Sequence, residues 1–63
     1  MGIYPAGNIV RLNSGELAVV LKTYAPDPYR PRVRVMVTAD GVRVPVEINI
    51  NLWEDERERL IEA

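Results

Sequence analysis

The sequence contains neither cysteine nor histidine. Without cysteine there is no disulfide and no thiolate nucleophile, which is typical of a cytoplasmic protein. Without histidine the chain loses both the commonest general base and the commonest metal ligand. We therefore expect no catalytic residue, no metal site and no cofactor in this chain.

Long apolar runs and aromatic residues are also scarce. The chain has no phenylalanine, one tryptophan and three tyrosines. No apolar run approaches the roughly 20 residues that a membrane helix needs, so no membrane contact is expected. With 63 residues in total, residues 1–63 are expected to form one small domain.

The charges are balanced overall but divided along the chain. The formal net charge is -1. Residues 1–43 carry six basic and three acidic side chains, whereas residues 44–63 carry two basic and six acidic ones. This division indicates either two solvated faces or a basic surface that meets an acidic partner.

The first two apolar segments predict a β-hairpin. Residues 9–12 and 17–24 flank Asn13-Ser14-Gly15-Glu16, a turn sequence. Both faces of the second segment are largely apolar up to Lys22, which predicts a central strand covered on both sides.

Further strands follow a stiff connection. Three prolines between residues 25 and 31 exclude a strand interior there. Residues 32–38 and 42–47 flank Asp40-Gly41, a strong hairpin signal, and Pro45 predicts an edge or a bulge. We expect Val42, Val44 and Val46 to point inward, and residues 48–52 to form a short fifth strand.

The end of the chain fits two structures. The sequence Asn51-Leu52-Trp53-Glu54 fits a helix cap, and Asp55 and Arg59 have the spacing of a helical ion pair. A helical turn followed by a short closing strand fits as well. The predicted fold is all-β, either a small five-stranded SH3-like barrel or a strongly bent antiparallel sheet, with a short C-terminal helical turn.

The candidate binding residues are arginines and aromatics. Arg30, Arg32 and Arg34 alternate, so an extended chain places them on one face. Tyr29 adjoins them, and Trp53 is either a plug at the core's rim or an anchor for a neighbouring domain. Such a surface suits a protein partner or single-stranded nucleic acid, and it equally fits a solvated strand face.

Several short segments together resemble a known family. They are Tyr4-Pro5-Ala6-Gly7, Ile9-Val10-Arg11-Leu12-Asn13-Ser14-Gly15-Glu16, Ala18-Val19-Val20, Pro26-Asp27-Pro28-Tyr29-Arg30-Pro31, Val33-Arg34-Val35 and Ile50-Asn51-Leu52. Their order resembles the small β-rich region that follows the catalytic domain in bacterial HD-GYP proteins, relatives of cyclic di-GMP phosphodiesterases. The resemblance covers roughly residues 4–52. Because the chain has no histidine, the metal ligands and activity of those enzymes cannot be assigned to any residue here.

The resemblance implies a non-catalytic accessory or regulatory domain of such a signalling phosphodiesterase, present as a fragment or free-standing. Its partner would be an adjacent catalytic domain or another protein, bound through Tyr29, Arg30 and Trp53. The alternative is a free-standing SH3-like module that binds nucleic acid. In either case a partly open barrel could also associate with itself edge to edge.

Overall fold

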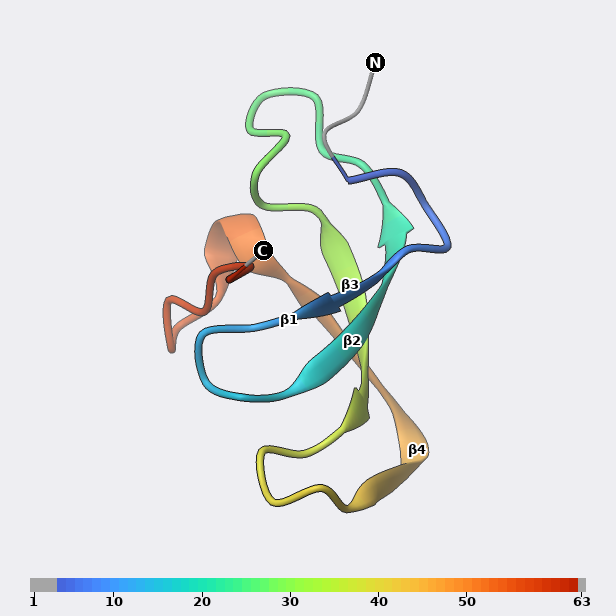
Figure 1. Cartoon of the computed structure of the whole chain (residues 1–63). Coiled ribbons are helices and arrows are strands. Elements are labelled where there is room, and N and C mark those ends of the chain that lie inside the picture. Colours follow the sequence, from blue (N-terminus) through green and yellow to red (C-terminus); the bar gives the residue numbers. More distant parts are fainter. Residues whose placement is uncertain (1–3, 63) are drawn as a thin grey trace.

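The protein is a four-stranded antiparallel sheet in the computed structural model, which describes residues 4–62. The strands are β1 (Ile9–Arg11), β2 (Leu17–Lys22), β3 (Arg32–Val37) and β4 (Arg43–Asn51), followed by the 3-10 turn η1 (Leu52–Glu54). They lie side by side in chain order, and the sheet is strongly twisted (Figure 1). The all-β prediction is confirmed. Residues 1–3 and 63, the ends of the predicted domain, lie outside the described part.

Both predicted hairpins are present. The β1–β2 turn is closed by hydrogen bonds that Leu12 N–H donates to Glu16 O (2.8 Å) and Gly15 N–H to Leu12 O (2.8 Å). In the β3–β4 turn, Gly41 N–H donates to Thr38 O at 2.9 Å. Gly15 and Gly41 have φ angles of 96° and 85°, a region that favours glycine.

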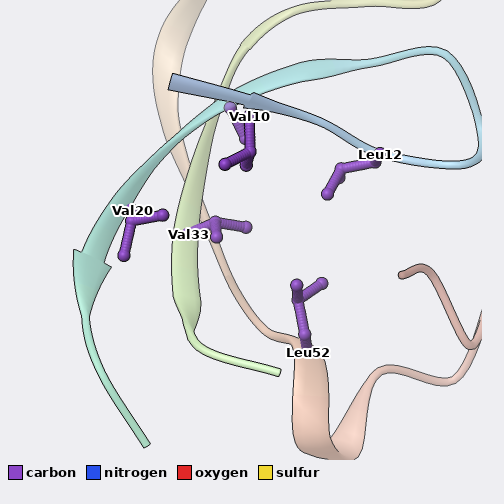
Figure 2. Packing of buried hydrophobic residues seen from close by; sticks show 6 residues of the cluster. Val10, Leu12, Val20, Val33 and Leu52 are labelled. Carbon is purple, nitrogen blue, oxygen red and sulfur yellow. The ribbon is translucent and has the colours of Figure 1, made fainter. Parts of the chain in front are cut away.

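The core lies on one face of the sheet, beneath η1. Its buried members come from β1 and the turn after it, β2, β3 and η1: Val10, Leu12, Ala18, Val20, Val33 and Leu52 (Figure 2). Tyr4, Ile50 and Ile61 pack against them. The prediction that β2 is central is confirmed, since it pairs with both β1 and β3. Its second face is only half-covered, however, because Leu17, Val19 and Leu21 remain half-buried.

The prediction for the fourth and fifth strands is wrong in two respects. Residues 48–51 continue β4 without a break, and Leu52 starts η1, so no separate strand spans 48–52. Val42 and Val46 do not point inward: they are 60% and 65% exposed. Val44 is half-buried, and Val42 precedes β4. For Val46 the reason is an irregular register. Between the pairs Val35–Ile48 and Val37–Arg43, β4 has extra residues that bulge away from β3. Pro45 lies in this bulge on an edge strand, as predicted.

The tail takes the second of the two structures that the sequence left open, a helical turn followed by a short pairing segment. One 3-10 turn replaces the longer helix, and residues 55–59 form no helix. Leu12 and Ile61 then form an isolated antiparallel bridge. Asn13 N–H donates to Leu60 O (2.8 Å), and Glu62 N–H donates to Arg11 O (2.7 Å). The tail therefore returns to the free side of β1.

Within residues 4–62, no helix is long and apolar enough to cross a membrane.

Candidate interaction surface

The connection between β2 and β3 is held against η1 by two contacts. The rings of Tyr24 and Trp53 stack, with their centroids 4.0 Å apart and their planes 10° from parallel. At the other end of the connection, Leu52 N–H donates a hydrogen bond to the carbonyl of the buried Pro31 (3.3 Å). The prolines restrict the backbone of this segment further. The connection is thus a rigid part of the surface.

Asp27 shapes the part of this connection that presents Tyr29. Its Oδ1 accepts a hydrogen bond from the Tyr29 backbone N–H at 3.2 Å, an Asx-type turn. Its Oδ2 lies 3.3 Å from Arg30 Nε. Both side chains of that ion pair are about two-fifths exposed, so the pair adds little stability. Tyr29 itself is 60% exposed.

The remaining predicted arginines lie on β3. Because Val33 and Val35 point into the core, Arg32 and Arg34 share the opposite face of the strand. Arg34 Nε donates to Asn49 Oδ1 (3.2 Å), and its Nη2 lies 3.5 Å from Glu47 Oε1. Arg32 is exposed and opposite both Lys22 and Asn51.

The structure therefore divides the predicted site residues into two groups. Arg30 lies in the connection rather than on β3, two residues before the strand pair of Arg32 and Arg34. Two of the three arginines already face a carboxylate of the same chain. Trp53 is half-buried, and its ring stacks on that of Tyr24, which is not among the predicted site residues.

A second polar cluster ties the tail to the first hairpin. Arg59 Nε lies 2.8 Å from Asp55 Oδ2, and Arg59 Nη1 lies 3.0 Å from Glu16 Oε1. The sequence predicted the Asp55–Arg59 pair, although on a helix. Glu16 is far away in the chain, and no local pattern marks it as a partner. All three side chains are at most 17% exposed.

The charges in this cluster change the acidity of its members. Hydrogen bonds from Arg59 lower the pKa of Asp55 to about 2 against the opposing effect of burial. Burial raises the pKa of Glu16, but hydrogen bonds from Ser14 and Arg59 outweigh it, and the net pKa is lowered. The Asp55 side chain in turn raises the pKa of Arg59. The three groups are therefore charged over the whole neutral range.

The described chain offers shallow surface features. A depression of about 380 Å³ lies between the end of β4 and residues 54–59. A smaller one of about 210 Å³ lies between β3 and the bulge of β4. Across residues 4–62, no three acidic side chains come together as a metal-binding group. The candidate residues Tyr29, Arg30, Arg32 and Arg34 thus lie on the connection and on β3, outside both depressions except for Arg34.

Comparison with known proteins places this fold in a family. The family model described as "KOW domain associated with HD domain" matches residues 9–61. A cyclic di-GMP phosphodiesterase of Pseudomonas aeruginosa is 46% identical over 46 residues, which are 73% of this chain and 11% of that protein. The chain thus spans about a tenth of the length of this relative. No solved structure matches.

These matches confirm the predicted resemblance to an accessory region of HD-type proteins. The match of the family model extends from β1 to the tail residue Ile61, so it includes the whole sheet and η1. The chain belongs to the family of KOW domains associated with HD domains.

Proposed function

We propose that this chain is a single non-catalytic accessory domain of an HD-GYP-type cyclic di-GMP phosphodiesterase. It acts in the cytoplasm by packing on the adjacent catalytic domain and tuning its activity. The family's association with HD domains supports the partner, and the Pseudomonas relative supports the reaction.

The observation that carries the proposal is the exposed Tyr29 on a rigid connection. Tyrosine, tryptophan and arginine are enriched where protein interfaces gain most of their binding energy. The Asp27 turn and the Tyr24–Trp53 stack already hold the connection in place. Docking would therefore order few additional groups, which lowers the entropic cost of binding. In this proposal Tyr29, Arg30 and Trp53 form the contact, and Arg32 and Arg34 extend it.

We also propose that the fold is an SH3-like barrel in which the tail supplies the closing strand. The strand order and the return of Ile61 to Leu12 support this. Closing the sheet in this way hides backbone groups of β1 that would otherwise be open.

A binding experiment tests the contact. The Pseudomonas phosphodiesterase, expressed without the region that matches this chain, is titrated with the chain in a calorimeter. We expect saturable binding of the native chain and a tenfold or greater loss of affinity for Tyr29→Ala, the loss of a well-packed aromatic anchor. Ile9→Ala is the matched control, because Ile9 is about as exposed as Tyr29 (67% against 60%) but lies on β1. Equal affinities for both variants would contradict the proposed surface.

Nucleic acid is the less favoured partner. Arg30 and Arg34 each face a carboxylate, which reduces the positive potential that phosphate binding needs. We expect no salt-dependent binding of labelled single-stranded RNA or DNA at micromolar protein. Affinity that falls steeply with salt would instead favour the nucleic-acid alternative.

A further inference from the structure

One edge of the sheet is covered by another segment of the chain, and the other edge is not covered within residues 4–62. On the β1 side, the tail covers the edge through the Leu12–Ile61 bridge. On the other side, no strand within residues 4–62 pairs with the outer edge of β4. β4 is the longest strand, with nine residues, and most of its side chains are exposed. Figure 1 shows it at the margin of the sheet, beside β3 alone.

The backbone pattern shows which groups of β4 face away from β3. Leu52 N–H donates to Pro31 O, so Leu52 and Pro31 lie opposite each other with their backbone groups directed toward one another. Antiparallel pairs alternate, and the β3–β4 register is regular from Asn51 back to Ile48. Ile50 and Ile48 therefore bond to β3. Asn49 and Asn51 direct their backbone N–H and C=O groups outward, and the same alternation, continued by one residue to the border of the bulge, places those of Glu47 outward as well.

We propose that this outer edge pairs antiparallel with the same edge of a second copy of the chain, about a twofold axis at Asn49. This inference goes beyond the proposed function and does not depend on it. In this register Asn49 pairs with the second copy's Asn49, and Glu47 pairs with the second copy's Asn51. A twofold interface must be self-complementary, and this register meets that condition.

Side-chain chemistry favours this register over its neighbours. Each Glu47 carboxylate faces the Asn51 amide of the second copy rather than a like charge. That amide donates one N–H to Glu54 Oε1 (2.9 Å) and has a second N–H for Glu47. Ile48, which is 42% exposed, lies opposite the second copy's Ile50 and gains an apolar neighbour. Arg34 already holds Glu47 and Asn49 from the adjacent strand, so both are positioned before pairing.

A register centred on Glu47 is worse for two reasons. It would oppose two carboxylates directly, and it would pair Asn49 with Pro45, which has no N–H to donate. The Pro45 bulge and η1 thus limit the pairing to residues 47–51.

The mass of the chain in solution tests the proposal. Sedimentation equilibrium should give a mass that rises with concentration from 7.1 kDa toward twice that value. Asn49→Lys places two ammonium groups at the twofold axis and should keep the chain monomeric, whereas Ile9→Lys on β1 should not. A mass of 7.1 kDa at every concentration up to about 1 mM, the limit of weak association, would overturn the proposal. So would dimers that Asn49→Lys leaves intact.

A cross-linking experiment tests the same pairing independently of the lysine variant and of how well that variant folds. The chain has no cysteine, so Asn49→Cys introduces a single thiol. A hydrogen-bonded antiparallel pair has Cα atoms about 5.5 Å apart, within disulfide reach. Mild oxidation should therefore convert Asn49→Cys into a covalent dimer at least tenfold faster than the control Ile9→Cys. Equal rates would show that the two β4 edges do not meet at this residue.

Discussion

Arg59 lies 3.0 Å from Glu16, although 43 residues separate them in the chain. This contact joins the tail to the turn of the first hairpin, and Asp55 holds the same guanidinium from the other side (2.8 Å). Ser14 Oγ donates to Glu16 at 2.6 Å and completes the cluster. The cluster thus adds a side-chain connection to the other contacts that hold the tail, which are the Leu12–Ile61 bridge and the packing of Ile61 on the core.

Replacing Arg59 should therefore destabilise the protein strongly. Arg59→Ala leaves two mostly buried carboxylates without their cation, and we expect a loss of about 2–4 kcal/mol in the free energy of unfolding. A domain of this size has only about 3–5 kcal/mol in total. Urea denaturation followed by circular dichroism measures the loss. Arg57→Ala, which removes an exposed arginine two residues away, should change stability by less than about 0.5 kcal/mol.

Stability should fall in acid because of Asp55. Its pKa is about 2 in the fold and about 3.9 in an unfolded chain, so the unfolded state binds the proton first. The contribution, about 2.6 kcal/mol, is complete above about pH 5 and is lost as the pH falls toward 2. The lowered pKa of Glu16 acts in the same direction.

Urea midpoints between pH 7 and pH 2 measure this dependence. Asp55→Asn should reduce stability at pH 7 and flatten the profile below pH 5. Glu56→Gln, which alters an exposed neighbour, should leave the profile unchanged. An Asp55→Asn variant with the native profile would show that other groups cause the acid sensitivity.

The Tyr24–Trp53 stack should appear as a coupling energy. In a double-mutant cycle of Tyr24→Ala and Trp53→Ala, we expect the two losses to be non-additive by about 0.5–1.5 kcal/mol. Tryptophan fluorescence of Tyr24→Ala reports the same contact, because Trp53 is the single tryptophan and becomes more exposed. Additive losses would mean that the rings do not interact in solution.

Two glycines with similar backbones should respond differently to alanine. Gly7 and Gly15 have φ angles of 94° and 96°, so alanine is strained by about 1–2 kcal/mol at either position. A Cβ at Gly15 would also lie 3.2 Å from the Ala39 Cβ, whereas none of the surrounding atoms lies within 4 Å at Gly7. Gly15→Ala should therefore be the less stable variant in thermal melts. An equal loss of stability in the two variants would show that the turn at Gly15 does not closely approach the turn at Ala39.

Local patterns predicted the hairpins and their turns, because glycine and alternating apolar residues act within a few positions. The same reasoning failed for Val46, because the bulge of β4 interrupts the alternation, and for Val42, which precedes β4 in the turn and is exposed. Separate fourth and fifth strands were predicted, whereas β4 is one continuous strand from Arg43 to Asn51. As an edge strand, β4 tolerates Pro45. The candidate binding residues were predicted by type and spacing, and their role stays a prediction. Their contacts, such as Tyr24 with Trp53 and Arg59 with Glu16, depend on how the tail returns across the fold.

The central claim, that the domain tunes a catalytic partner, is tested most directly by the rate of cyclic di-GMP hydrolysis. The assay compares the intact Pseudomonas phosphodiesterase, a form without the matching region, and a form in which this chain replaces that region. Our account predicts that kcat/KM falls at least fivefold on deletion and returns with the replacement, unless the replacement carries Tyr29→Ala. Hydrolysis that is equally fast in all these forms would contradict it.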